Sequence, residues 1–123
     1  MTIAFWCVLA AAGLPFLFAG AAKWSRRFDN HHPRDYLDAL SGWRRRAHAA
    51  QLNSFEAFPL FASAVVINHL VAGANATANL LALAFVALRI LFGVLYIADL
   101  ATLRSLVWMA AVGCCVALFV TAA

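Results

Sequence analysis

Three charged residues lie inside long apolar stretches of this 123-residue chain: Glu56, Arg89 and Arg104. An Arg or Asp at the centre of a membrane-spanning helix costs about 2.5–3.5 kcal/mol on insertion scales. Such residues usually face the interior of a helix bundle, where they bind ligands or take part in catalysis. A guanidinium group can hold a carboxylate or stabilise a thiolate, and a carboxylate can hold an ammonium group. These three residues are therefore the first candidates for a site.

The three residues share one side of the predicted membrane. Glu56 comes ten residues after Arg46, and Arg89 comes ten residues before Asp99. At a rise of 1.5 Å per residue, each lies about 15 Å along its helix from the same polar boundary. Arg104 lies nearer to that boundary. The spacing predicts a site that opens toward this side.

Helical phase groups the polar residues further. At 100° per residue, Arg46 and Asn53 are about 20° apart on the second apolar segment, and Glu56 lies about 60° further round. On the third segment one face carries Arg89, Phe92 and Tyr96. Glu56 and Arg89 are natural partners, either in a ligand site or in a buried ion pair that only fixes helix packing.

Two of these residues also have a simpler interpretation. Arg104 can be an interfacial anchor whose long side chain reaches the headgroups. Tyr96 can belong to the aromatic belt at the membrane surface. Both interpretations stay open beside the functional one.

The elements that must position these residues follow from composition. Hydrophobic residues make up 66% of the chain and charged residues 11%, against about 45–50% and about 25% in soluble domains. Four runs are long enough for membrane-spanning helices, which need about 20 apolar residues. We expect one all-α domain over 1–123, an up-down bundle of four transmembrane helices at 2–22, 47–72, 76–97 and 100–121.

The polar segment 23–46 sets the predicted orientation. It holds seven of the nine Lys and Arg residues, and basic residues in short loops stay in the cytoplasm. The loop is thus expected inside and both termini outside. No Lys or Arg precedes the first apolar run, so we expect an uncleaved span and not a signal peptide. The loop serves as a topology signal attracted to anionic lipids or contacts a ligand directly; no nucleic-acid partner is expected.

The histidines and cysteines do not predict a metal site. No carboxylate stands at ligand spacing beside the histidines, and the cysteines lie in apolar runs, where they resemble small buried residues. The residues are His31, His32, His48, His69, Cys7, Cys114 and Cys115. We expect no bound metal.

Several motifs resemble those of the MAPEG family, the membrane-associated proteins of eicosanoid and glutathione metabolism. The second segment contains Asn53-x-x-Glu56 followed by Phe58-Pro59-Leu60-Phe61. The third contains Arg89-x-x-Phe92-x-x-x-Tyr96, and Leu103-Arg104-Ser105 resembles the start of the family's fourth helix. The resemblance covers nearly the whole chain and is closest to small bacterial members of unassigned function. It therefore implies a multi-pass protein of a bacterial inner membrane.

The resemblance implies a site for glutathione as co-substrate. Family enzymes are trimers that bind glutathione between subunits, near the cytoplasmic side. Asn53 and Glu56 would hold its peptide backbone and amino group, Arg89 and Tyr96 would complete the cleft, and Arg104 would face the thiol. A free thiol has a pKa of about 8.5, and a nearby Arg lowers it toward the reactive thiolate.

Two positions depart from the family pattern. Family enzymes commonly have an Arg four residues before the Asn, where this chain has Ala49. Arg46 lies on the Asn53 face and is the residue expected to substitute for it. Phe92 stands where a tyrosine is frequent.

The expected function is a glutathione-dependent transferase or peroxidase acting on a lipophilic electrophile or hydroperoxide that arrives from the bilayer. A second hypothesis is a non-catalytic member that binds a lipid or a partner protein in the same cleft between subunits. A third is a small transporter in which Glu56 is the proton or cation site. The enzyme requires Arg104, the binding protein does not, and the transporter requires Glu56 to change protonation.

Overall fold

The computed structural model describes residues 1–123 and contains only helices. In chain order they are α1 (Ile3–Lys23), α2 (Pro33–Asp38), α3 (Gly42–Ala72), α4 (Ala76–Ile97) and α5 (Ala101–Val120). All except α2 are long and apolar enough to cross a membrane. The predicted all-α fold with four membrane-spanning helices is confirmed.

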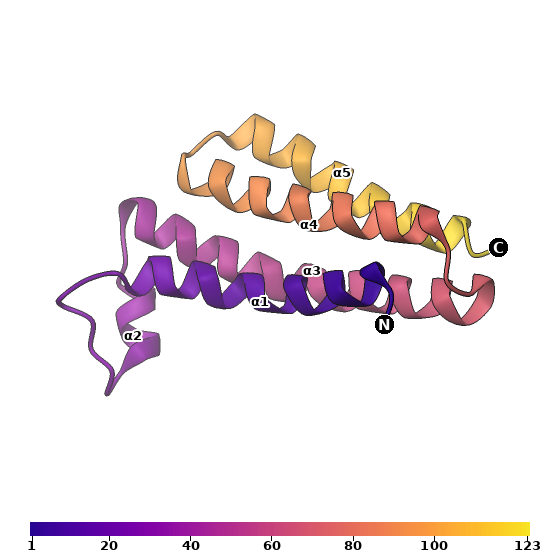
Figure 1. Cartoon of the computed structure of the whole chain (residues 1–123). Coiled ribbons are helices and arrows are strands. Elements are labelled where there is room, and N and C mark those ends of the chain that lie inside the picture. The colour runs from indigo at the N-terminus through magenta and orange to yellow at the C-terminus, as the bar shows by residue number, and fades with distance from the viewer.

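Consecutive long helices run in opposite directions (Figure 1). The α1–α3 pair lies beside the α4–α5 hairpin, and α4 packs against both α1 and α3. Both termini and the α3–α4 turn lie at one end of the bundle. The short helix α2 and the α4–α5 turn lie at the other end (Figure 1).

The helix boundaries differ from expectation mainly in the polar segment. Helix α3 begins at Gly42, five residues before the predicted start at 47, and α2 lies within the predicted loop 23–46. The apolar run marks where lipid begins and does not mark where a helix begins, because Arg and Ala are good helix formers in water. Pro33 is the first residue of α2, a position where its fixed φ and missing N–H are favourable.

Small residues allow the helices to approach closely. Ala4, Cys7 and Ala11 of α1 are buried at helical spacing against the other helices. In lipid, such contacts contribute through close packing, because burial of apolar surface gives little driving force there. At Gly93 of α4 a Cβ atom would overlap the ring of Phe18, so these two helices touch through a position that has no side chain.

Asparagines tie the helices together at the end that carries the termini; we call this the asparagine end. Asn68 is fully buried and donates from Nδ2 to the carbonyl of Leu118 (2.7 Å). Its Oδ1 accepts from Asn75 Nδ2 (3.0 Å). Asn79 Oδ1 accepts from the backbone N–H of Ala4 (2.9 Å). These bonds satisfy backbone groups at helix ends and link α1, α3, α4 and α5.

Candidate functional site

The centre of the site is a chain of hydrogen bonds between α3 and α4. Arg89 is 2% exposed, and its Nη2 donates to Asn53 Oδ1 (2.9 Å) and to Ser54 Oγ (3.3 Å). Asn53 in turn donates from Nδ2 to Glu56 Oε2 (3.2 Å). The buried cation is thereby connected to an exposed carboxylate through one amide side chain; we call these three residues, Asn53, Glu56 and Arg89, the central network.

The predicted direct partnership of Glu56 with Arg89 is not formed. The only ion pair within 4.0 Å in the protein is between Arg46 and Asp99. Asn53 stands between the two charges because it lies one turn before Glu56 and faces α4 more directly. Glu56 points outward from the bundle and is exposed, so its carboxylate keeps room for a further partner.

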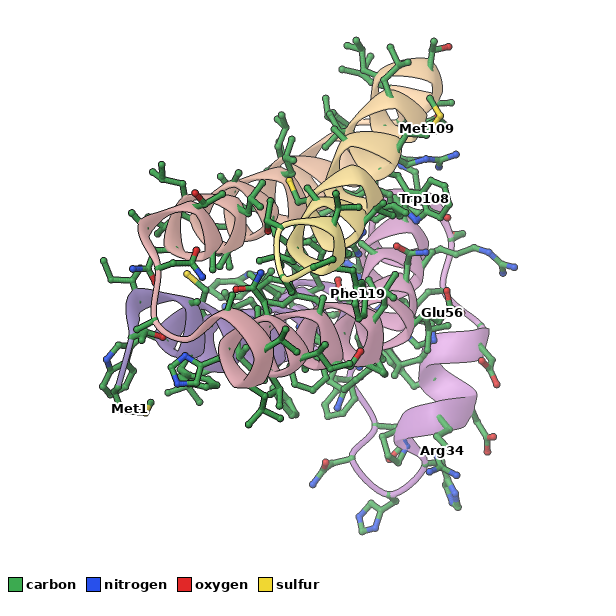
Figure 2. All side chains as sticks on the ribbon, turned by 90° about the vertical axis from the view of Figure 1, so that its right-hand side faces the viewer. Met1, Arg34, Glu56, Trp108, Met109 and Phe119 are labelled. Atoms are coloured by element: carbon green, nitrogen blue, oxygen red, sulfur yellow. The ribbon has the colours of Figure 1, made fainter.

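A small cavity of about 110 Å³ lies beside the central network, between α3, α4 and α5. Figure 2 shows Glu56 of α3 and Trp108 of α5 on the same side of the molecule. The other lining residues are Asn53, Ala57, Leu60, Phe85, Arg89, Ala111, Val112 and Cys115. The cavity therefore combines two opposite charges with an apolar wall.

The α5 wall of this cavity was not predicted from the sequence. Trp108, Ala111 and Cys115 of this wall follow the predicted site residue Arg104 at spacings of four, three and four residues, which places all four on one helical face. That spacing was the signal available. The spacing does not show which helix this face meets, so the sequence alone does not place Trp108, Ala111 and Cys115 in the site.

Arg104 and Tyr96 are joined to the central network by stacked side chains. The guanidinium carbon of Arg104 lies 4.3 Å from the centre of the Tyr96 ring. Tyr96 packs edge-on against Phe92, with 5.5 Å between ring centres, and Arg89 lies 4.2 Å over Phe92. Cations over aromatic faces are attracted by the ring quadrupole. Two arginines thus lie at the two ends of an aromatic pair.

The distance along α4 between Arg89 and Tyr96 matches the length of a short peptide. Arg89 and Tyr96 are seven residues apart on α4, about 10 Å along the helix axis. An extended tripeptide spans about the same length, at 3.3–3.6 Å per residue. The arrangement can therefore hold the two ends of one small peptide-like ligand.

The MAPEG family model matches residues 3–123, essentially the whole chain. The chain belongs to the MAPEG family. Members generally use glutathione and are typically trimeric. No curated protein and no solved structure matches the chain. The predicted family and a multi-pass location in a membrane are confirmed.

Arg46 does not take the place of the arginine that MAPEG enzymes commonly have at the position of Ala49. Its Nε donates to the carbonyl of Ile97 (2.9 Å), and its Nη1 lies 4.0 Å from Asp99. Seven residues before Asn53, it lies about 10 Å further along α3. The last carbonyls of α4 need donors and hold it there. Arg46 is thus not bonded to Asn53 or Glu56, and its predicted role in ligand binding stays a prediction.

Of the histidines and cysteines, only Cys115 lines the cavity beside the central network. His48 shares a hydrogen bond with Gln51 (3.1 Å). All three cysteines are free, and Cys7 and Cys115 are buried as predicted. No group of three or more His, Cys, Asp or Glu residues has metal-binding geometry.

Proposed function

We propose that this protein is a membrane glutathione-dependent transferase or peroxidase that acts on lipophilic electrophiles or hydroperoxides. The observation that carries the proposal is the central network, with its exposed carboxylate and buried guanidinium, placed about one tripeptide length along α4 from Tyr96, over which Arg104 lies. Family membership supports a glutathione-related role in general.

The charges of the site complement those of glutathione, which carries one ammonium group and two carboxylates. Glu56 has a free side for the ammonium group, and the Asn53 amide is close enough to contact the peptide backbone. Arg89 uses only Nη2 within the protein, which leaves its other nitrogens for a carboxylate. Tyr96 closes the cleft toward Arg104.

A second subunit is needed to complete this site. The cavity of about 110 Å³ is smaller than the about 300–1,000 Å³ of typical small-molecule sites. Glu56 is exposed although it lies at membrane depth, where contact of a charge with lipid is costly. A neighbouring subunit that covers this groove would enlarge the site and shield the carboxylate. This arrangement supports a homotrimer with clefts between subunits.

Arg104 is the proposed catalytic residue. Its guanidinium would stabilise the thiolate of glutathione. The sulfur would form a C–S bond as the leaving group of an electrophile departs, or attack a hydroperoxide oxygen as the O–O bond breaks and the alcohol leaves. In the second case another glutathione would reduce the resulting sulfenic acid, giving the disulfide and water. The apolar side of the groove, which includes Trp108, would admit that acceptor from the bilayer. Arg104 is held over Tyr96, so its position is fixed before glutathione arrives.

We infer that loop 23–46 faces the cytoplasm of a bacterial inner membrane. The basic residues of this segment support that orientation. The site would then open to the compartment that contains glutathione, because Tyr96 and Arg104 lie toward the same end of the bundle as α2 (Figure 1).

The test is titration of the detergent-purified protein with glutathione, followed by thiolate ultraviolet absorbance and by calorimetry. The wild type should bind and show the thiolate signal. Arg104→Ala should bind but lose most of the signal, and Glu56→Gln should bind about tenfold or more weakly. Arg45→Gln is the control, because it also removes one positive charge but at an exposed position outside the proposed site. Absence of both signals at millimolar glutathione would refute the enzyme proposal.

One observation favours a second candidate, a non-catalytic MAPEG member that binds a lipid or partner protein in the same cleft. Arg46 is engaged at the end of α4 and Ala49 offers no charge, so one cationic contact common in family enzymes is missing. Such a protein would keep ligand binding after Arg104→Ala and show no turnover. A transporter would instead show a flux that depends on Glu56 and follows a proton gradient.

A further inference from the structure

The segment between α1 and α3 forms a second cavity, unrelated to the central network. It has a volume of about 330 Å³ and lies against α2. We call it the α2 pocket; its lining residues are Ser25, Arg27, Tyr36, Ala39, Leu40, Ser41, Trp43 and Arg44. No Asp or Glu lines it, whereas two arginines and three hydroxyl groups do.

Polar atoms in the α2 pocket lack partners within the protein. Tyr36 Oη and Arg44 Nε are both buried without a hydrogen bond. The Ser41 hydroxyl does not cap α3, although Ser41 is the N-cap residue of that helix. Neither Arg27 nor Arg44 forms an ion pair. Because buried polar atoms are nearly always paired in folded proteins, the unpaired Tyr36 Oη and Arg44 Nε indicate a missing acceptor, which the exposed Arg27 and Ser41 could also reach.

Neighbouring aromatic residues hold these donors in place. Arg44 lies 5.5 Å from the centre of the Trp43 ring. Tyr36 packs edge-on against Phe28, with 5.2 Å between ring centres. Neither acidic residue of α2, Asp35 or Asp38, lines the α2 pocket, and Asp38 lines other cavities together with His48. The pocket is therefore positively charged and largely preformed.

The position of the α2 pocket along the bundle matches the headgroup layer. Arg44 comes three residues before Ala47, where the apolar part of α3 begins, and so lies about 4.5 Å outside the hydrocarbon. The polar layer on each side of a bilayer is about 5–7 Å thick. Trp24 and Trp43 are 80% and 43% exposed, and exposed Trp at this level is typical of the membrane interface.

We propose that the α2 pocket binds the headgroup of an anionic glycerophospholipid, with the phosphodiester between Arg27 and Arg44. A guanidinium group matches phosphate oxygens with two parallel hydrogen bonds. The Tyr36 hydroxyl supplies a third donor, and Ser25 and Ser41 are placed to contact headgroup hydroxyls. A cationic choline headgroup fits poorly, because no carboxylate lines the pocket to receive it.

The test is native mass spectrometry of the full-length protein in detergent, titrated with phosphatidylglycerol or phosphatidylcholine. The wild type should retain phosphatidylglycerol about tenfold or more tightly than phosphatidylcholine. Arg44→Gln should reduce phosphatidylglycerol affinity about tenfold, the loss expected for charge-assisted hydrogen bonds. Tyr36→Phe removes only the unpaired hydroxyl and should weaken binding several-fold while the fold is kept.

Arg45→Gln is the matched control, because Arg45 is adjacent and exposed but does not line the α2 pocket. It should change phosphatidylglycerol affinity less than twofold. Equal losses in the Arg44 and Arg45 variants would show diffuse attraction to basic residues and overturn the site. The site would also be overturned if neither Tyr36→Phe nor Arg44→Gln, each tested alone, changed the affinity for phosphatidylglycerol. Displacement of the lipid by millimolar inorganic phosphate would identify a soluble phosphate as the ligand and refute the lipid proposal.

Discussion

Asn53 decides how the two opposite charges of the site are related. It accepts from Arg89 and donates to Glu56 at the same time, so neither charge neutralises the other directly. A direct ion pair would leave the interior neutral and closed to a ligand. The amide between them preserves two separate binding groups within one connected network.

Replacement of Asn53 by leucine should therefore weaken both stability and ligand binding. Arg89 would keep only Ser54 as a polar partner, at a cost of about 1–3 kcal/mol for a hydrogen bond to a charged group. Unfolding in mixed detergent micelles measures the loss of stability, and calorimetry with glutathione measures the loss of affinity. Gln51→Leu, which removes a bond only to His48, should cost less; equal losses would contradict the role given to Asn53.

Asp99 carries an unusual backbone conformation for its residue type. Its φ is +63°, a left-handed conformation that glycine adopts most easily. The N–H of Leu100 bonds to the Leu95 carbonyl (3.0 Å) and that of Asp99 to the Tyr96 carbonyl (3.1 Å). This pattern is a Schellman motif in which glycine is the usual residue at the position of Asp99.

Asp99→Gly should raise the stability of the protein by about 0.5–1 kcal/mol, because it relieves the left-handed strain. The contact with Arg46 spans 4.0 Å, with the Asp99 side chain 69% exposed, and such surface pairs contribute about 0–1 kcal/mol. Thermal unfolding in detergent measures the change. Asp99→Asn tolerates the same backbone and tests the charge alone. Midpoints below that of the wild type in both Asp99→Gly and Asp99→Asn would show that the ion pair dominates.

At the scale of elements, the four long helices were predictable because a bilayer requires apolar runs of about 20 residues. The predicted span 76–97 coincides with α4, and the ends of α1 and α5 differ from prediction by one residue each. The start of α3 and the presence of α2 were missed, because both lie where hydropathy carries no helical information. Pairings between helices, such as Arg46 with Ile97, depend on helix rotation, which the spacing within one helix does not determine.

Gly93 shows how closely the elements pack. Gly93→Ala would bring a Cβ atom into the Phe18 ring, and overpacking of this kind costs about 1–3 kcal/mol. We expect reduced resistance to unfolding in mixed micelles. Gly113→Ala is the control, because nothing lies within 4 Å of that position.

The companion change Phe18→Leu checks the cause. In the double variant with Gly93→Ala, the smaller side chain leaves space for the added methyl group. The two losses should then be less than additive in a double-mutant cycle. Strict additivity would mean that the ring and the glycine do not meet.

At the scale of the whole molecule, the two ends of the bundle are held unequally. The asparagine end carries several hydrogen bonds among four helices. At the opposite end, the hydrogen bond from Arg46 to Ile97 joins α3 to α4 near the α4–α5 turn. Figure 1 shows α5 diverging from the α1–α3 pair toward that turn, whereas Tyr96 and Ile97 at the end of α4 pack against buried residues of α1 and α3.

Hydrogen exchange should reflect this inequality. Amides near the α4–α5 turn should exchange faster than those near the asparagine end, because local opening is easiest where fewest bonds must break. Asn68→Leu should speed exchange at the end of α5, where Leu118 would lose its donor. Arg46→Gln should speed exchange only around the α4–α5 turn. Uniform exchange along α4 and α5 would contradict the expected difference.

Helix α5 is joined to the α1–α3 pair by hydrogen bonds only at the asparagine end, so its displacement should grow with distance from Asn68. Arg104 lies near the far end of α5, where this displacement is largest, whereas Arg89 lies on α4, which packs against both α1 and α3. Thermal motion of α5 would then change the width of the groove beside Arg104 while the hydrogen bonds of the central network stay formed. The same motion would limit the rate at which lipophilic molecules enter the site from the bilayer and leave it again.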